Sequence, residues 1–296
     1  GVWECPDFFP MKVENSDETK WVLLQSLNPG GPNGGSGTQY FIGDFDGTNF
    51  TLDSSFKKDI DKEGVIWLDH GRDNYAGVTW SNIHTEDGRH LFIGWMSNWD
   101  YAQEVPTETW TSTMTISREI KLVKMEEHYR LLSMPVSELD NYKNVISESN
   151  DLKGTEHSLA KNNVDLGKAM IEISLTDLIS ANYQFSLANS KGEKLLFGLN
   201  KAEGLFFIDR SMSGTNTFSE KFANKISVAK MGEMIEDHVD ITILLDKTSI
   251  ELFYNHGEMV MTELFFPSEP MNELRLEAGG NEIHIKRIKL SEINLN

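Results

Sequence analysis

Short stretches in which apolar and polar residues alternate follow one another along nearly the whole chain. They are rich in Val, Ile, Phe, Trp and Thr, and Gly, Asn and Asp separate them. A period of two is the pattern of half-buried β-strands, and long amphipathic helical patterns are missing. The sequence therefore predicts an all-β protein.

The first part of the chain contains two groups of four predicted strands. They cover residues 8–14, 20–27, 38–45 and 48–53, and then 64–69, 74–81, 90–97 and 111–123. Asp46-Gly47 and Asp87-Gly88 are turn signals of the kind that joins antiparallel neighbours. Two consecutive groups of four antiparallel strands fit two blades of a β-propeller better than they fit a single sheet.

The pattern becomes charged between about residues 124 and 142, where Pro135 and the residues after it can open a short helix. We place the boundary there, which gives a propeller-like domain at 1–125, a linker at 126–142 and a second domain at 143–296. Short, closely spaced strands in the second domain are typical of a β-sandwich. They are predicted at 168–175, 181–188, 204–209, 239–245, 248–254, 258–265 and 273–289.

Size and charge exclude several classes of protein. A chain of 296 residues exceeds the usual size of one hydrophobic core, which favours two domains. The 27 basic and 46 acidic residues give a net charge of −19, which disfavours nucleic acid and anionic membranes as partners. No apolar run reaches the roughly 18 residues needed to span a bilayer. The lone Cys5 cannot form an intrachain disulfide.

Glu4 is the first candidate catalytic residue. It stands in residues 3–9, Trp-Glu-Cys-Pro-Asp-Phe-Phe, and apolar surroundings of this kind favour a protonated carboxyl. A protonated carboxyl is what a general acid needs. Because a glutamate beside a tryptophan is also an ordinary strand residue, the motif on its own leaves both interpretations open.

The segment Trp-Glu-Cys-Pro-Asp resembles the acid/base signature of glycoside hydrolase family 32, which comprises invertases, inulinases and levanases. Further stretches resemble the same family in the same order along the chain. They are 28–47, 68–80, 93–102 and 109–120, and then 204–210, 245–253 and 260–267. Residues His70, Arg72, Asn74 and Ser117 depart from the commonest family pattern. The similarity covers essentially the whole chain.

The resemblance implies a five-bladed β-propeller followed by a β-sandwich, with about the last two blades present here. It implies retaining, exo-acting hydrolysis of β-fructosidic bonds in fructan or sucrose, in a secreted or periplasmic enzyme. Glu4 would be the acid/base residue, Asp69 and Arg72 a polar pair at the rim of the substrate pocket, and Trp99 a wall that stacks on the sugar. A solvated turn explains Asp69 and Arg72 equally well, and core packing is the usual role of a tryptophan.

A retaining glycosidase uses two carboxyl groups about 5–5.5 Å apart. In the family the nucleophile lies in a Trp-Met-Asn-Asp-Pro-Asn-Gly motif and a stabilising aspartate in an Arg-Asp-Pro motif, and neither occurs in this sequence. We therefore expect a fragment with negligible activity on its own. Its exposed sheet edges predict self-association, or pairing with a missing N-terminal portion.

No cofactor and no metal is implied, because two carboxyl groups suffice for glycosidic hydrolysis. Asp44, Asp46, Glu86 and Asp87 are explained more simply as exposed acidic turns than as calcium ligands. Two alternatives to a hydrolase domain stay open: a non-catalytic module whose sandwich holds fructan without cutting it, and one half of a split gene. The sequence leaves sucrose, inulin and levan open as substrates.

Overall fold

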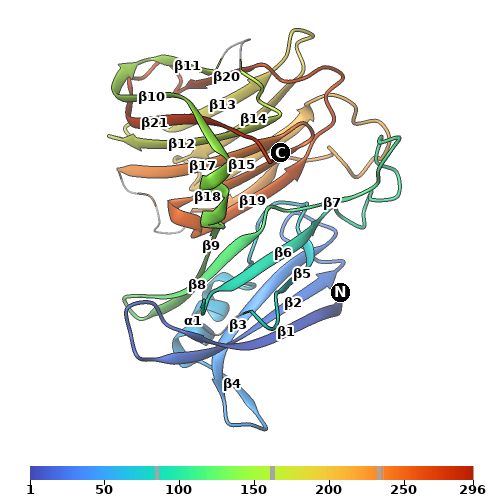
Figure 1. Cartoon of the computed structure of the whole chain (residues 1–296), viewed down its shortest axis with the longest axis vertical. Coiled ribbons are helices and arrows are strands. Elements are labelled where there is room, and N and C mark those ends of the chain that lie inside the picture. Colours follow the sequence, from blue (N-terminus) through green and yellow to red (C-terminus); the bar gives the residue numbers. More distant parts are fainter. Residues whose placement is uncertain (84–86, 161–163, 232–234, 236, 296) are drawn as a thin grey trace.

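The computed structural model describes residues 1–83, 87–160, 164–231, 235 and 237–295. Figure 1 shows two lobes stacked along the longest axis of the molecule, the lower one built from β1 to β9 and the upper one from β10 to β21. We refer to residues 1–135 as the N-terminal unit and to residues 137–293 as the C-terminal unit. Within the described residues, no helix has the length and apolar character needed to cross a lipid bilayer.

The first sheet of the N-terminal unit has four antiparallel strands in the order β1-β2-β3-β4. The strands are β1 (Val2–Lys12), β2 (Thr19–Asn28), β3 (Gly37–Phe45) and β4 (Phe50–Leu52). The four predicted strands are confirmed, although β1 begins six residues earlier than predicted. That difference places Glu4 on a strand.

A helix, α1 (Ser54–Glu63), follows β4 and was not predicted. Asp53 caps its N-terminus, because the carboxylate accepts hydrogen bonds from the first free backbone N–H groups of the helix. Phe56 is fully buried and Ile60, one turn later, packs against the same core. Two apolar residues are too short a pattern to predict a helix. The strand predicted at 64–69 is wrong, since this segment makes a single isolated bridge to β3.

The second sheet has the order β5-β6-β8-β9, with β7 paired to β6. Its strands are β5 (Tyr75–Thr79), β6 (His90–Met96), β7 (Thr113–Met114), β8 (Arg118–Met125) and β9 (His128–Pro135). The strand predicted at 111–123 is thus two strands, and β9 occupies much of the segment predicted as a linker. Tyr129 and Leu131 of β9 are buried in the core that both N-terminal sheets share. The neighbouring charged hairpin turn hides this alternation in the sequence.

The C-terminal unit contains two six-stranded antiparallel sheets, whose orders are β10-β21-β12-β17-β18-β19 and β11-β20-β13-β14-β15-β16. The strands of the first are β10 (Lys143–Gly154), β12 (Lys168–Thr176), β17 (His238–Asp246), β18 (Ser249–Tyr254), β19 (Met259–Leu264) and β21 (Ile283–Ile293). Those of the second are β11 (Glu156–Ala160), β13 (Asn182–Ala188), β14 (Lys194–Asn200), β15 (Leu205–Met212), β16 (Ser227–Lys230) and β20 (Glu273–Glu277). Short 3-10 helices lie at η1 (Ser137–Tyr142), close to the predicted helix, and at η2 (Asn255–Gly257).

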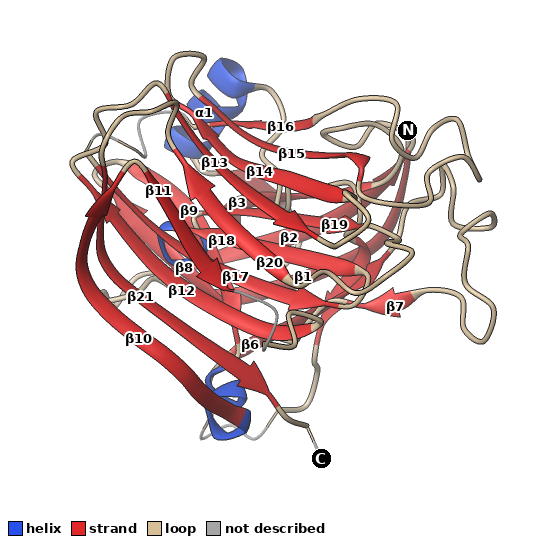
Figure 2. Cartoon of the chain, turned by 90° about the horizontal axis from the view of Figure 1, so that it is seen from above, coloured by secondary structure: helices blue, strands red, loops and turns tan. Residues whose placement is uncertain are grey.

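One apolar core lies between the two six-stranded sheets. Figure 2 views the strands of these sheets from above. Ile171 and Ile243 enter it from one sheet, and Phe185, Phe197 and Phe206 enter it from the other. The predicted strands of this unit are confirmed, with 273–289 divided into β20 and β21. The sequence missed β10, β11, β14 and β16.

The two units meet along β19, the edge strand of the first six-stranded sheet. His70 donates its backbone N–H to Val260 O at 2.7 Å, and Asp73 donates to Thr262 O at 3.1 Å. Between them, Gly71 lies so close to β19 that a Cβ atom would stand 2.1 Å from Thr262 O. The chain of the N-terminal unit therefore runs directly against β19.

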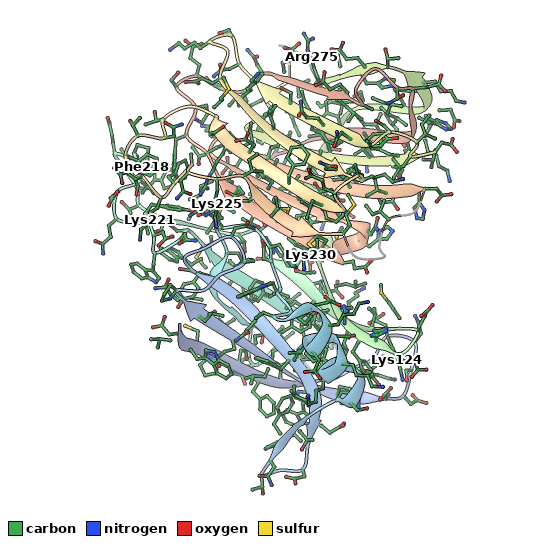
Figure 3. The ribbon with its side chains drawn as sticks, turned by 180° about the vertical axis from the view of Figure 1, so that it is seen from behind. Lys124, Phe218, Lys221, Lys225, Lys230 and Arg275 are labelled. Carbon is green, nitrogen blue, oxygen red and sulfur yellow. The ribbon has the colours of Figure 1, made fainter. Side chains whose placement is uncertain are left out.

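An apolar cluster also joins the units. Met96 and Tyr101 of the N-terminal unit pack with Phe222, Leu264 and Phe266 of the C-terminal unit, and Phe218 lies against them. Figure 3 labels Phe218 and, beside it, Lys221, at the level where the two lobes meet. The apolar contacts of this cluster hold the two units against each other.

Candidate active site around Glu4

Glu4 lies near the start of β1, where the strand is irregular. The residue pairs with Ser26 of β2, and the register of the two strands shifts between Glu4 and Asp7. Cys5, at the shift, has a φ of 50°, which marks a β-bulge. Gln25 fixes the backbone here, because its amide donates to the Glu4 carbonyl oxygen at 2.7 Å. Bulges of this kind re-aim a side chain, here the exposed carboxylate of Glu4.

The hydroxyl of Tyr75, on β5, donates a hydrogen bond to Glu4 Oε2. Tyr75 is only 3% exposed, and its burial, together with the hydrogen bond to Glu4, raises the pKa of Tyr75 above its usual value. The phenol therefore stays protonated and remains a donor. The Glu4 side chain itself is exposed, so the apolar enclosure that the sequence suggested for it is not formed by its neighbours in residues 3–9.

A second contact holds β1 against β5. Asp7 Oδ2 accepts hydrogen bonds from the backbone N–H of Thr79 at 2.6 Å and from its hydroxyl at 2.8 Å. Glu4 and Asp7 thus both bind the same strand of the second sheet. The position of Glu4 is set by the junction of the two N-terminal sheets.

Aromatic side chains continue from Tyr75 along the surface. The ring centroids of Tyr75 and Trp95 are 6.3 Å apart, and those of Trp95 and Trp99 are 5.0 Å apart. Trp99 is 50% exposed, whereas Trp95 is half-buried. Trp99 donates its backbone N–H to Ser36 Oγ at 3.2 Å. The structure therefore brings Glu4 and Trp99 into one neighbourhood, and Trp99 offers an open aromatic face there.

Asp69 does not lie at a pocket rim, as its sequence motif suggested, but is 2% exposed inside the contact between the units. Its Oδ2 atom is 2.9 Å from Arg118 Nη1 and accepts the hydroxyl of Thr262 at 2.6 Å. Burial alone would raise the pKa of Asp69, but the charge of Arg118 outweighs it and lowers the pKa. Asp69 is thus a buried, ionised partner of Arg118.

Arg72 is also buried, at 2% exposure. No hydrogen bond found among the described residues joins it to Glu4. Its Nη1 atom donates to Phe222 O at 2.8 Å, and its guanidinium lies 5.3 Å from the ring centroid of Tyr101. Asp100 is 3.7 Å from its Nη2 atom. The placement of Asp69 and Arg72 supports a structural role and gives no support to contact with substrate.

Two clusters of ion pairs cross the contact between the units. The arginine belongs to the N-terminal unit in one cluster and to the C-terminal unit in the other. In the first, Arg118 of the N-terminal unit reaches Glu251 of β18 at 2.6 Å. In the second, Arg210 of β15 reaches Asp73 of the N-terminal unit and Glu263 of β19, each at 2.8 Å. Each unit therefore contributes one arginine that binds a carboxylate of the other.

Sequence reasoning missed this pair of clusters. A signal was present, because Glu251 and Glu263 interrupt apolar runs, and every residue of β18 and β19 is buried. A charge that stands at a fully buried strand position requires a partner. The identity of the partner depends on how the two units dock, which the sequence pattern does not contain.

No cluster of three or more His, Cys, Asp or Glu side chains suited to a metal ion is found among the described residues. Of the acidic turns considered above, Asp44 binds Lys20 at 3.1 Å and Asp46 accepts two backbone N–H groups of its own turn. Asp87 binds Arg89 at 2.6 Å. Glu86 lies outside the described residues.

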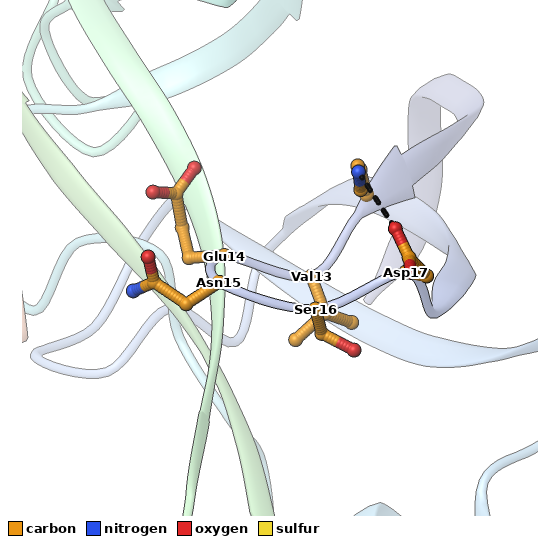
Figure 4. Close-up of a pocket in the computed structure, with 6 residues that line it drawn as sticks. Val13, Glu14, Asn15, Ser16 and Asp17 are labelled. Atoms are coloured by element: carbon orange, nitrogen blue, oxygen red, sulfur yellow. Dashed lines mark hydrogen bonds and ion pairs between the residues drawn. The ribbon is translucent and has the colours of Figure 1, made fainter.

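The hollow drawn in Figure 4 belongs to the turn between β1 and β2 and is lined by residues 12–17. Its volume is about 490 Å³, and Lys12 and Asp17 form an ion pair at its edge at 3.3 Å. Glu4 lies eight residues earlier on the same strand, which places it roughly 26 Å away at about 3.3 Å per residue. This hollow is therefore separate from the Glu4 surface.

Two family models match the chain: the glycosyl hydrolases family 32 N-terminal domain at residues 1–135 and the family 32 C-terminal domain at residues 137–292. The chain belongs to glycoside hydrolase family 32. The junction between the two models coincides with the end of β9 and lies within residues 126–142, the predicted linker.

Curated family 32 relatives match along nearly the whole chain. A levanase of Bacillus subtilis is 35% identical over 294 residues, which are 98% of this chain and 42% of the levanase. An extracellular exo-inulinase of Aspergillus ficuum is 32% identical over 303 residues, which cover 99% of this chain and 55% of that protein. The chain thus spans about half the length of the curated relatives it matches.

Solved family 32 structures have the same fold. The exo-inulinase of Aspergillus awamori superposes with a TM-score of 0.85 at 30% identity and covers 99% of this chain and 57% of its own. The β-fructofuranosidase of Schwanniomyces occidentalis, complexed with fructosyl-erythritol, gives 0.81 at 26% identity and covers 99% and 60% of the two chains. The mostly β architecture described above is therefore that of family 32 enzymes.

Proposed function

We propose that this chain supplies the acid/base carboxyl group, Glu4, for the hydrolysis of β-fructosidic bonds in fructan or sucrose. The observation that carries the proposal is the hydrogen bond between Tyr75 and the exposed carboxylate of Glu4, at the junction of two sheets. An acid/base residue must be accessible to substrate and held in a fixed position. Glu4 meets both requirements, and Trp99 provides an aromatic surface nearby on which a sugar ring can stack.

The relatives support this chemistry, since they are named levanase, exo-inulinase and β-fructofuranosidase. In a retaining mechanism Glu4 would protonate the departing glycosidic oxygen and then deprotonate the water that releases the fructosyl group. Tyr75 keeps its proton, so it is suited to orient the Glu4 carboxylate. Glu4 would then carry out the proton transfer. Asp69 and Arg72 would act indirectly, by holding the two units together.

We also infer that the two N-terminal sheets are blades of a β-propeller and that the C-terminal sheets form its accompanying sandwich. A second carboxylate is needed for hydrolysis, and neither aspartate motif of the family lies within these 296 residues. Strand β1 is an outer strand of its sheet and exposes Val2, Trp3 and Phe8. Pairing of this face with further polypeptide would bring in the missing carboxylate. Secretion is proposed because the exo-inulinase relatives are named extracellular.

The test is Glu4→Gln in the complete gene product, with whatever its gene encodes upstream of Gly1. Loss of the acid/base group lowers the rate of fructose release from levan, inulin or sucrose by about 10²- to 10⁴-fold. The loss is smaller for an aryl fructoside, because a phenolate leaving group needs no proton. Glu14→Gln, on the exposed turn after β1, is the matched control and leaves the rate unchanged.

The same assay tests the need for a second carboxylate. The 296-residue chain alone is expected to release no fructose at an enzymatic rate, and the complete product is expected to do so. Equal rates of Glu4→Gln and unsubstituted enzyme on all substrates would contradict the role of Glu4. Reading the gene upstream of Gly1 shows directly whether the two aspartate motifs stand there in frame.

A further inference from the structure

A groove crosses the outer face of the second six-stranded sheet, on the side of the sheet opposite the core. Its volume is about 450 Å³, and strands β13, β14, β15, β16 and β20 contribute to its lining. Figure 2 shows β13 to β16 side by side. We call this hollow the outer groove. It is built entirely by the C-terminal unit, so it is distinct from the surface around Glu4.

The strand register brings several lining residues of the groove into one row of the sheet. One row of paired residues runs across the sheet through Glu277, Gln184, Gly198, Phe207 and Val228. Its middle position is a glycine with a φ of 147°, where a Cβ atom would stand 2.0 Å from Tyr183 O. Only glycine suits this position, because the backbone of the neighbouring strand leaves no room for a side chain.

The lining combines two kinds of side chain. Gln184 and Glu277 are hydrogen-bonded to each other at 3.0 Å, and Asn200 lies in the next row of the sheet. Phe207 is half-buried, and Val228 is 39% exposed. Amides and carboxylates in a fixed arrangement beside a half-buried ring match a ligand with both hydroxyl groups and apolar faces.

The charge of the lining residues limits the chemical class of the ligand further. Glu203 and Glu277 contribute to it, whereas none of the lining residues is Lys or Arg. Lys230, labelled in Figure 3, lies at the end of β16 in register with Leu205 but is not part of the lining. An anionic ligand is therefore disfavoured, as is nucleic acid by the net charge of −19. A neutral polyhydroxylated chain fits best.

We propose that the outer groove is a second carbohydrate site, which binds a neutral oligosaccharide without cutting it. The identity of the sugar as a fructan segment rests on the proposed function, but binding in the groove does not. The groove spans five strands, about 19 Å at roughly 4.8 Å per strand spacing, which is room for several sugar rings. The proposal assigns to one sheet face the fructan-holding role that the sequence left open for the sandwich.

The groove is connected to the Glu4 surface through the loop before β3. Asn33, 3% exposed, exchanges hydrogen bonds with the backbone N–H and C=O of Val228, both at 3.0 Å. Ser36 of the same loop accepts the backbone N–H of Trp99. One loop therefore borders both surfaces, so a polymer held in the groove stays close to Glu4 and its local concentration there rises.

The test is calorimetric titration of the 296-residue chain with levan-derived and inulin-derived oligosaccharides, with a malto-oligosaccharide as the comparison sugar. Phe207→Ala is expected to weaken binding of the fructan oligosaccharide about tenfold, because the ring supplies most of the stacking area. Gln184→Ala is expected to weaken it about threefold through loss of hydrogen bonds. Circular dichroism confirms that each variant is folded.

A matched pair of leucines provides the control. Leu205 and Leu196 are both half-buried on the outer face of adjacent strands, but only Leu205 lines the groove. Leu205→Ala is expected to weaken binding about threefold, and Leu196→Ala is expected to leave it unchanged. Equal effects of the two substitutions would mean that binding responds to the sheet as a whole, and this would overturn the proposal.

Two further variants separate this site from the surface of the proposed function. If the outer groove binds the sugar, Trp99→Ala and Glu4→Gln retain most of the affinity. If Trp99→Ala abolishes binding while Phe207→Ala does not, the groove is not a sugar site and the proposed function is unaffected. If Phe207→Ala weakens binding but Glu4→Gln leaves hydrolysis by the complete gene product intact, the groove stands and the proposed function fails. Absence of sugar binding together with a shift in oligomeric state in Leu205→Ala would identify a second copy as the occupant.

Discussion

The carboxylates of this protein occupy two contrasting environments. Glu4 is exposed and accepts one hydrogen bond from a side chain among the described contacts, from Tyr75. Asp69 and Glu251 are 2% and 4% exposed, and Arg118 binds both. The same functional group is thus open to solvent in one place and joins two structural units in the other.

The difference lies in what happens when a partner is removed. A carboxylate at the surface regains water when it loses a neighbour, so it is free to exchange protons and costs little stability. A buried carboxylate has no water to regain, so it must keep its partner. Residues of the second kind are unsuited to proton transfer, even where their sequence motif belongs to a catalytic family. The free energy of unfolding should therefore respond to substitution in proportion to burial.

The largest effect is expected for Arg118→Met. The substitution leaves Asp69 and Glu251 as uncompensated buried charges, which lowers the free energy of unfolding by about 3–5 kcal/mol. Urea denaturation followed by tryptophan fluorescence measures the loss. All seven tryptophans lie in the N-terminal unit, so circular dichroism is followed in parallel to report on the C-terminal sheets.

The matched control is Arg287→Met, which breaks an exposed ion pair with Glu148. Its stability should stay close to that of the unsubstituted chain, because exposed pairs contribute little. The triple variant Arg118→Met, Asp69→Asn, Glu251→Gln removes the stranded charges and should regain part of the loss. If Arg118→Met were no more destabilising than the control, the contrast between the two environments would be wrong.

The sequence singled out Glu4 as a candidate residue but did not predict the environment of either kind of carboxylate. Glu4 was identified because the residues around it form a short contiguous motif, and short motifs survive without knowledge of the fold. The role of Asp69 was misjudged because its partners, Arg118 and Thr262, are 49 and 193 residues away. Contacts between residues so far apart in the sequence depend on how the two units dock. The alternation of apolar and polar residues along a strand carries no information on that docking.

The secondary structure, too, was predicted only in part. Strands with a clear period of two were predicted correctly, for example β2, β3, β12 and β17. The sequence missed α1, because Phe56 and Ile60 are the only apolar residues among its ten. It also missed β10, none of whose residues is buried, so that the strand gives no apolar alternation. Elements that bury little apolar surface leave little trace in the pattern.

An intermediate effect is expected at Asp53, which is half-buried at the start of α1. Burial would raise the pKa of Asp53, but hydrogen bonds from Ser55 and from Lys20, whose ammonium is 2.9 Å away, lower it to about 2. A pKa below the unfolded value of 3.8 means that the ionised carboxylate stabilises the fold above about pH 4. This stability is lost progressively as the pH falls below about 4 and through the folded pKa of about 2.

The substitution Asp53→Asn isolates that charge, because asparagine caps a helix about as well as aspartate. At pH 7 it should lower the free energy of unfolding by about 1 kcal/mol, after allowance for screening by solvent. The difference from the unsubstituted chain should shrink through the acid range and vanish only below about pH 2, as measured by urea denaturation. A difference that did not change with pH would show that the cap acts without its charge.

The smallest effects are expected at Glu4 itself. Tyr75→Phe removes a buried hydroxyl whose partner is an exposed carboxylate, and the loss should be about 0.5 kcal/mol, the lower end for a hydrogen bond, because Glu4 regains water. Glu4→Gln should be indistinguishable from the unsubstituted chain, since the amide oxygen still accepts the Tyr75 hydroxyl. A double-mutant cycle by urea denaturation gives the coupling between the two side chains. A coupling as large as the Arg118 effect would mean that Glu4 helps to hold the sheets together, and the surface carboxylate would then be no freer for chemistry than the buried ones.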